Sequence, residues 1–121
     1  MASSISISAP NSLVLISGGN GAVPDRFESG TAVAATSTTI VIGTLNELDG
    51  PTRITLAKGQ ADIGGLRKLF VGKLHDLTGK LVIQTCEGAL LLSGDVDNPC
   101  ASIEVFSNDH SEPDKILIVY S

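Results

Sequence analysis

The stretch "SNDHSEPDK", residues 107–115, holds the densest group of side chains that can do chemistry in this sequence. Asp109, Glu112 and Asp114 lie close together, and His110 stands among them. Carboxylates with an imidazole can bind a metal ion or transfer protons. The same residue types also favour turns between strands, because Asn, Asp and Ser side chains bond to nearby backbone. We interpret the stretch as a solvent-exposed turn, with a metal site or a His110–Glu112 acid–base pair as less favoured alternatives.

Two more acidic loops, "NELDG" (46–50) and "DVDNP" (95–99), extend the metal hypothesis. The second resembles the start of an EF-hand calcium loop but does not match it, because counting from Asp95 puts Cys100 at the glycine position and Phe106 at the final glutamate position. Three loops that met at one end of a sandwich could still hold calcium. The candidate ligands are Asp95, Asp97, Asp109, Glu112 and Asp114. We expect no metal and no other cofactor, with calcium as the alternative.

Other motifs that resemble active sites fail on inspection. In "SGGNGAVPDRF" (17–27), Pro24 replaces the third glycine of a dinucleotide-binding loop, and no helical period follows. His75 and Asp76 are adjacent, so on a strand they would point to opposite faces, and we interpret them as part of a turn. No residue set with a nucleophile and its base emerges, and we predict no catalytic residues and no enzyme activity.

The cysteines and the N-terminus bear on the compartment. Cys86 and Cys100 form neither a C-x-x-C motif nor a zinc-ligand pattern. The first residues carry no Lys or Arg before Arg26, and their densest apolar stretch is residues 13–16, so they do not read as a secretory signal. We therefore expect a cytoplasmic protein with two thiols rather than a disulfide.

Composition narrows the function classes. Hydrophobic residues make up 42% and charged residues 17%, which excludes a disordered chain and suits one domain over residues 1–121. No run approaches the roughly 18 apolar residues of a membrane-spanning helix. A net charge of −5 with 3% aromatic residues argues against nucleic-acid binding.

The charge is unevenly distributed along the chain. Residues 1–52 carry −3, residues 53–80 carry +4, and residues 81–121 carry −6. A basic middle and an acidic end suit strand pairing within the chain or head-to-tail association, unless the charges simply scatter over solvated faces. The acidic C-terminal third would also suit a basic protein partner.

Period-2 alternation with β-branched residues recurs along the chain and predicts an all-β protein. Helix is nearly absent, although "GQADIGGLRKL" (59–69) has room for one short turn. We expect strands within nine segments: 3–9, 12–17, 36–45, 52–58, 66–74, 79–86, 88–94, 101–107 and 114–120. About eight or nine strands, with turn signals every ten to twelve residues, predict an antiparallel β-sandwich with jelly-roll or Greek-key connections.

The strand register of one hairpin can be predicted from the sequence alone. With Glu87-Gly88 as a two-residue turn, Ile83 lies opposite Leu92, and Leu81 and Leu90 fall on the same face. Gly88 supplies the positive φ that such a turn requires. We predict that all four apolar side chains are buried together.

The last strand, "ILIVY" (116–120), has no polar face. Such a strand is covered on both sides, either between layers of its own chain or by another copy. We predict a homo-oligomer, with a dimer favoured, whose interface includes Leu117 and Val119.

The function that fits these features is a small non-enzymatic module that binds another protein or its own copies. The alternative is a calcium-dependent ligand-binding domain of the lectin or C2 kind, using loops 46–50, 95–99 and 108–114.

Overall fold

The computed structural model describes residues 2–19, 33–46, 48–109 and 113–121. Its strands are β1 (Ala2–Ile7), β2 (Leu13–Ser17), β3 (Val33–Ala35), β4 (Thr39–Gly43), β5 (Thr52–Lys58), β6 (Arg67–Leu74), β7 (Lys80–Thr85), β8 (Leu90–Asp95), β9 (Ala101–Ser107) and β10 (Lys115–Tyr120). A 3-10 turn, η1 (Pro10–Ser12), joins β1 to β2. Within the described ranges no helix has the length and apolar character needed to cross a membrane.

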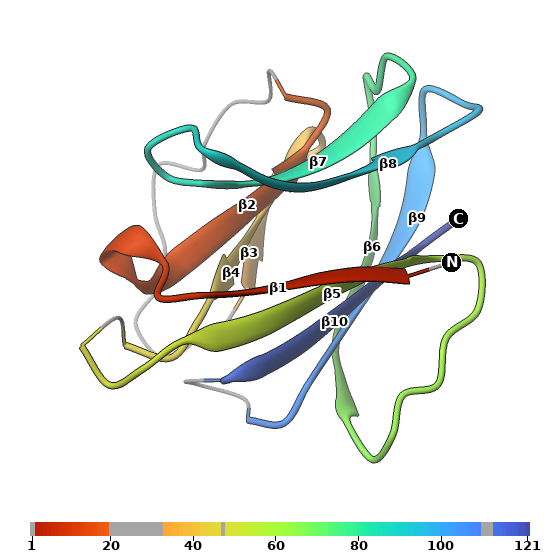
Figure 1. Ribbon diagram of the computed structural model, residues 1–121. Helices are drawn as coiled ribbons and strands as arrows, with labels where there is room; N and C mark the ends of the chain where they lie inside the picture. The colour runs from red at the N-terminus through yellow and green to blue at the C-terminus, as the bar shows by residue number, and fades with distance from the viewer. Residues whose placement is uncertain (1, 20–32, 47, 110–112) are drawn as a thin grey trace.

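The strands form two five-stranded sheets that pack face to face (Figure 1). Sheet A has the order β1-β5-β10-β9-β6, and sheet B has the order β3-β4-β2-β7-β8. Neighbours run antiparallel except β5 and β10, which are parallel. The predicted β-sandwich is confirmed. All nine predicted segments contain strands, and β3 was missed because its three residues are too few to show alternation.

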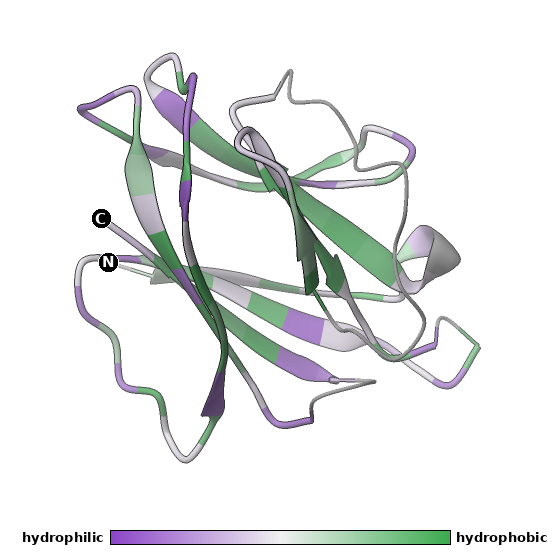
Figure 2. Cartoon of the chain, turned by 180° about the vertical axis from the view of Figure 1, so that it is seen from behind, coloured by the Kyte–Doolittle hydropathy of each residue, from purple (hydrophilic) through white to green (hydrophobic). Residues whose placement is uncertain are grey.

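Alternation puts the core between the sheets. Ile54 and Leu56 of sheet A and Ile40 and Ile42 of sheet B all join the main buried cluster. Figure 2 shows hydrophobic stretches along the strands of both sheets, interrupted by hydrophilic positions on some strands and in the loops. Burial of this apolar surface is the main force that holds the two layers together.

The central strand β10 is buried on both faces. Ile116, Ile118 and Tyr120 face the main core. Leu117 and Val119 face outward, yet they are only 6% and 7% exposed. They belong to a second cluster with Ala57 and Phe106, against which Ala61 and Leu66 pack.

The cover over Leu117 and Val119 therefore comes from segment 59–66 of the same chain. Strands β5 and β6 run in the same direction in one sheet, so the segment that joins them must return along that sheet. The prediction that this face needs a second copy as its cover is wrong. A homo-oligomer stays a prediction, without support from these two residues.

Segment 59–66 contains no helix, in contrast to the predicted short turn of helix. Gly64 and Gly65 have φ of 55° and 88°, the left-handed region that glycine adopts without a steric cost. Asp62 Oδ1 accepts a hydrogen bond of 2.9 Å from the Gly64 N–H, which fixes a local turn.

The hairpin of β7 and β8 follows the predicted register at its base and departs from it near the tip. Ile83 pairs with Leu92 as predicted, but Gln84 then pairs with Leu90, because a bulge inserts one residue into β8. The bulge turns Leu90 outward, where it is 63% exposed. The prediction that Leu90 shares the buried face is wrong.

The sandwich has two ends that differ in their loops. We name the two ends after the first and last residues of β10. The Tyr120 end also contains the start of β1, the end of β5 and the loop between β8 and β9. The Lys115 end contains the end of β1, the start of β5 and the start of β8. β1 starts and β10 ends at the Tyr120 end, so the N and C marks lie close together in Figure 1.

The bulge gives a stability prediction with a matched control. Ile83→Ala should lower the free energy of unfolding by about 2–5 kcal/mol, because the side chain is fully buried and its loss leaves a cavity. Leu90→Ala should change it by no more than about 0.5 kcal/mol, because Leu90 lies on the surface. Urea unfolding measures both. Equal losses for the two variants would contradict the observed register.

Candidate functional site

The three acidic loops do not meet. Loop 44–51 touches the 108–114 loop at the Lys115 end, where the Leu45 N–H bonds to the Pro113 carbonyl at 2.8 Å. Loop 95–99 lies at the Tyr120 end, where Pro99 accepts a hydrogen bond of 2.9 Å from Leu77.

This separation rules out the shared calcium site. Strand β10 separates the two ends by roughly 16 Å, whereas calcium ligands lie within about 2.6 Å of the ion. Asp95 and Asp97 are therefore far from Asp109 and Asp114, and Glu112 and His110 lie outside the described residues. Among the residues that are described, no three His, Cys, Asp or Glu side chains gather as metal ligands would.

The 107–115 stretch forms a turn in its described part. The Lys115 N–H donates to Asn108 Oδ1 at 3.1 Å, and the Asn108 amide also bonds to the Asp114 carboxylate. Ser107 Oγ donates to the Asp109 carbonyl at 2.7 Å. The prediction that Asn108 bonds to backbone is confirmed, whereas Pro113 is buried against loop 44–51 rather than exposed.

The remaining sequence motifs also have structural roles. His75 and Asp76 are exposed in the turn after β6, where Asp76 has φ of 59°. Cys86 and Cys100 form no disulfide, as predicted, and lie at opposite ends of the sandwich. Most of the glycine-rich stretch 17–27 lies outside the described residues.

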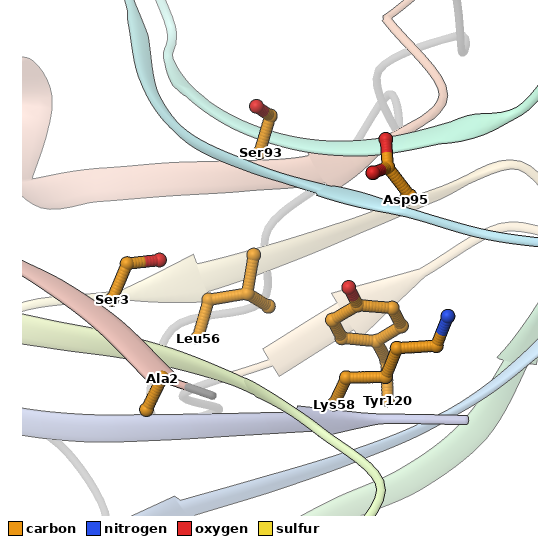
Figure 3. Close-up of a pocket in the computed structure, with 7 residues that line it drawn as sticks. All are labelled: Ala2, Ser3, Leu56, Lys58, Ser93, Asp95 and Tyr120. Atoms are coloured by element: carbon orange, nitrogen blue, oxygen red, sulfur yellow. The ribbon is translucent and has the colours of Figure 1, made fainter.

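A cavity at the Tyr120 end is the site that sequence reasoning missed. Its volume is about 410 Å³, and it lies where the edge strands β1 and β8 flank the interior (Figure 3). Residues from four strands line it: Ala2 and Ser3 of β1, Leu56 and Lys58 of β5, Ser93 and Asp95 of β8, and Tyr120 of β10.

The strand registers explain why these residues converge. Ser3 lies opposite Leu56, and Tyr120 lies beside Lys58, so all four side chains share the inner face of sheet A. In Figure 3 the Tyr120 hydroxyl and the Lys58 ammonium both point toward β8. The sequence signal for this site is weak: one tyrosine, the only one in the chain, ends an otherwise aliphatic run.

The Tyr120 hydroxyl has no hydrogen-bond partner among the described residues, although the residue is only 5% exposed. Gly94 of β8 packs directly against the ring, so a Cβ there would lie 2.7 Å from Tyr120 Cζ. Among the described residues the one fully buried side-chain oxygen without a partner is Thr39 Oγ1, so the Tyr120 oxygen itself keeps some exposed surface at the cavity. The hydroxyl is therefore open to water or to a ligand that enters the cavity.

Charge around the cavity is mixed. Burial and then the charge of Asp95 raise the pKa of the Tyr120 hydroxyl above its ordinary value of 10.0. Lys58 Nζ lies 3.8 Å from Asp97 Oδ2, and both side chains are well exposed. The cavity thus offers a neutral hydroxyl beside one cation and one carboxylate, Asp95, while Asp97 lies next to Lys58 outside the lining. The lining residues bring no base to a nucleophile.

Comparison with known proteins adds information about the fold. No protein-family model matches the chain, and no curated protein is similar to it in sequence. The chain resembles the crystal structure of ComJ, inhibitor of the DNA degrading activity of NucA, from Bacillus subtilis, with a TM-score of 0.69. The alignment covers 98% of this chain and 93% of that chain at 12% identity. At this identity the likeness establishes the shared fold alone.

The contact between Gly94 and Tyr120 can be tested by a double-mutant cycle. Gly94→Ala should destabilise the protein by about 1–3 kcal/mol, because the added methyl group overlaps the buried ring. In a Tyr120→Leu background the same substitution should cost clearly less, since the outer part of the ring is gone. Additive losses in urea unfolding would show that the two residues do not compete for space.

The single tyrosine makes the cavity observable by ultraviolet titration. Tyr120 should ionise above pH 10, and Asp95→Asn should lower its pKa because one neighbouring negative charge is removed. The native state holds the tyrosine proton more tightly than the unfolded chain, so the free energy of unfolding should fall as pH rises above about 10. Tyr120→Phe should lack this part of the decline. A Tyr120 pKa at or below its ordinary value would contradict the assignment.

Proposed function

We propose that the protein is a non-enzymatic protein-binding module that inhibits a basic partner enzyme, with a nuclease as the first candidate. The observation that carries this proposal is the likeness in fold to ComJ, which extends over nearly the whole of both chains. The cavity supports a binding role, because it presents an unsatisfied hydroxyl without an arrangement of nucleophile and base.

Electrostatics favours a partner of this kind. Enzymes that act on DNA carry basic surfaces for the phosphate backbone. A chain with a net charge of −5 is attracted to such a surface, which raises the rate of encounter.

The acidic C-terminal third is not one surface. Glu87, Asp109 and Asp114 lie at the Lys115 end, whereas Asp95 and Asp97 lie at the Tyr120 end. We propose the Tyr120 end as the contact, because the Asp95 carboxylate lines a cavity there together with the Tyr120 hydroxyl, which has no hydrogen-bond partner among the described residues. Concave pockets beside polar groups are where interface anchors dock.

The test begins with capture on the immobilised protein from an extract of its own cells, followed by elution with salt. The eluted DNA-degrading activity is then assayed with purified protein added back. We expect the activity to fall in stoichiometric proportion to the added protein. If the captured material has no such activity, or keeps it at saturating protein, the nuclease assignment fails.

Charge variants locate the contact. Asp95→Asn with Asp97→Asn should weaken inhibition roughly tenfold or more, as expected when charges at an interface centre are lost. Asp49→Asn with Glu87→Gln removes the same charge from the Lys115 end and is the matched control. A larger loss in the control pair would move the contact to the opposite end.

A further inference from the structure

Each sheet has two edge strands, and they differ in how they are protected from pairing with another chain. Edge strands are usually guarded by charge or by short length. β6 carries Arg67, Lys68 and Lys73, and β3 is only three residues long. β8 is different, because residues 90–94 read "LLLSG" without a charge, and Leu90 is 63% exposed.

The hydrogen-bond phase of β8 shows which backbone groups face outward. The Val96 N–H bonds to the Gly79 carbonyl at 3.1 Å, so residues 79 and 96 form a hydrogen-bonded pair. In an antiparallel ladder such pairs alternate with pairs that make no bonds to each other. Within the register of β7 and β8, Asp95 and Ser93 fall in the non-bonded positions. Their N–H and C=O groups therefore point away from β7, toward the open edge.

We propose that the open edge of β8 pairs with the same edge of a second copy of this chain. An antiparallel arrangement centred on Ser93 would let Ser93 and its counterpart exchange two backbone hydrogen bonds. Such a contact is two-fold symmetric and closed, and it joins the two B sheets into one. It also closes the side of the cavity that Ser93 and Asp95 line.

Charge and apolar area favour a second copy as the occupant. With the centre at Ser93, the two Asp95 carboxylates lie four residues apart along the ladder, roughly 13 Å, so their repulsion is small. The same pairing at β6 would bring its basic residues toward their own counterparts. β1 is also uncharged, but its exposed residues are small or serine, so pairing there covers little apolar surface.

A proline substitution tests the backbone role of Ser93. Proline removes the outward N–H without removing a bond to β7, and proline is tolerated on edge strands at such positions. We expect the wild-type protein to sediment at twice the monomer mass at micromolar concentration. Ser93→Pro should sediment as a monomer with nearly unchanged unfolding, and the control Ser93→Ala should remain a dimer because it keeps the N–H.

A second pair of variants covers the case in which Ser93→Pro fails to fold. Leu90→Lys adds a guarding charge to the edge and should also give monomers. Its control, Leu48→Lys, changes an even more exposed leucine in loop 44–51 and should leave the dimer intact. A monomeric wild type overturns the proposal, as does a dimer that survives Ser93→Pro or Leu90→Lys. Sedimentation of the protein alone measures the dimer without the inhibition assay, so the two proposals are tested separately. Because the dimer covers the cavity rim that the proposed partner contacts, the partner should displace the second copy rather than bind to the dimer.

Discussion

The parallel pairing of β5 with β10 is the constraint on which most of this structure depends. β10 is apolar on both faces, so water must be excluded from each of them. A central place in sheet A buries Ile116 and Ile118 against sheet B. The outer face then requires a cover, and the parallel course of β5 and β6 supplies one, because the connecting segment 59–66 has to return along the sheet. One pairing thus determines the sheet order, the path of the longest described loop and the second apolar cluster.

The same pairing creates the cavity at the Tyr120 end. It sets Tyr120 beside Lys58, while β1 adds Ser3 from the other side of β5. Sheet B approaches through β8, where Gly94 leaves just enough room for the ring. The hydroxyl borders the cavity and has no hydrogen-bond partner among the described residues. The end of a structural strand thus supplies the polar group on which the proposed binding site depends.

The uneven charge along the sequence is partly explained by which strands are neighbours in the sheet, and only the remaining charges are available for a partner. The basic middle segment supplies β6 and the acidic end supplies β9, and these strands are neighbours, with Lys68 Nζ 3.0 Å from Glu104 Oε2. Lys68 also lies 5.8 Å from the centre of the Phe106 ring, where a cation is attracted to the aromatic face. Pairing within the chain thus accounts for part of the uneven charge. The carboxylates in the loops are the ones left for a partner.

The sequence by itself determined the class of the fold and the strand positions, because alternation with period 2 and the intervening turn residues are local properties. It determined the pairing of Ile83 with Leu92 for the same reason, since a hairpin register depends on residues close in sequence. It did not determine the bulge that exposes Leu90, nor the cover over Leu117 and Val119, because both depend on neighbours fixed by the whole sheet.

The three acidic loops have similar sequences, and only the direction of each strand decided that loop 95–99 lies at the opposite end from the other two. The cavity at Tyr120 has only a weak local signature, the single tyrosine at the end of an aliphatic run. Its residues come from four strands spread between positions 2 and 120, and only the packing of the two sheets brings them together.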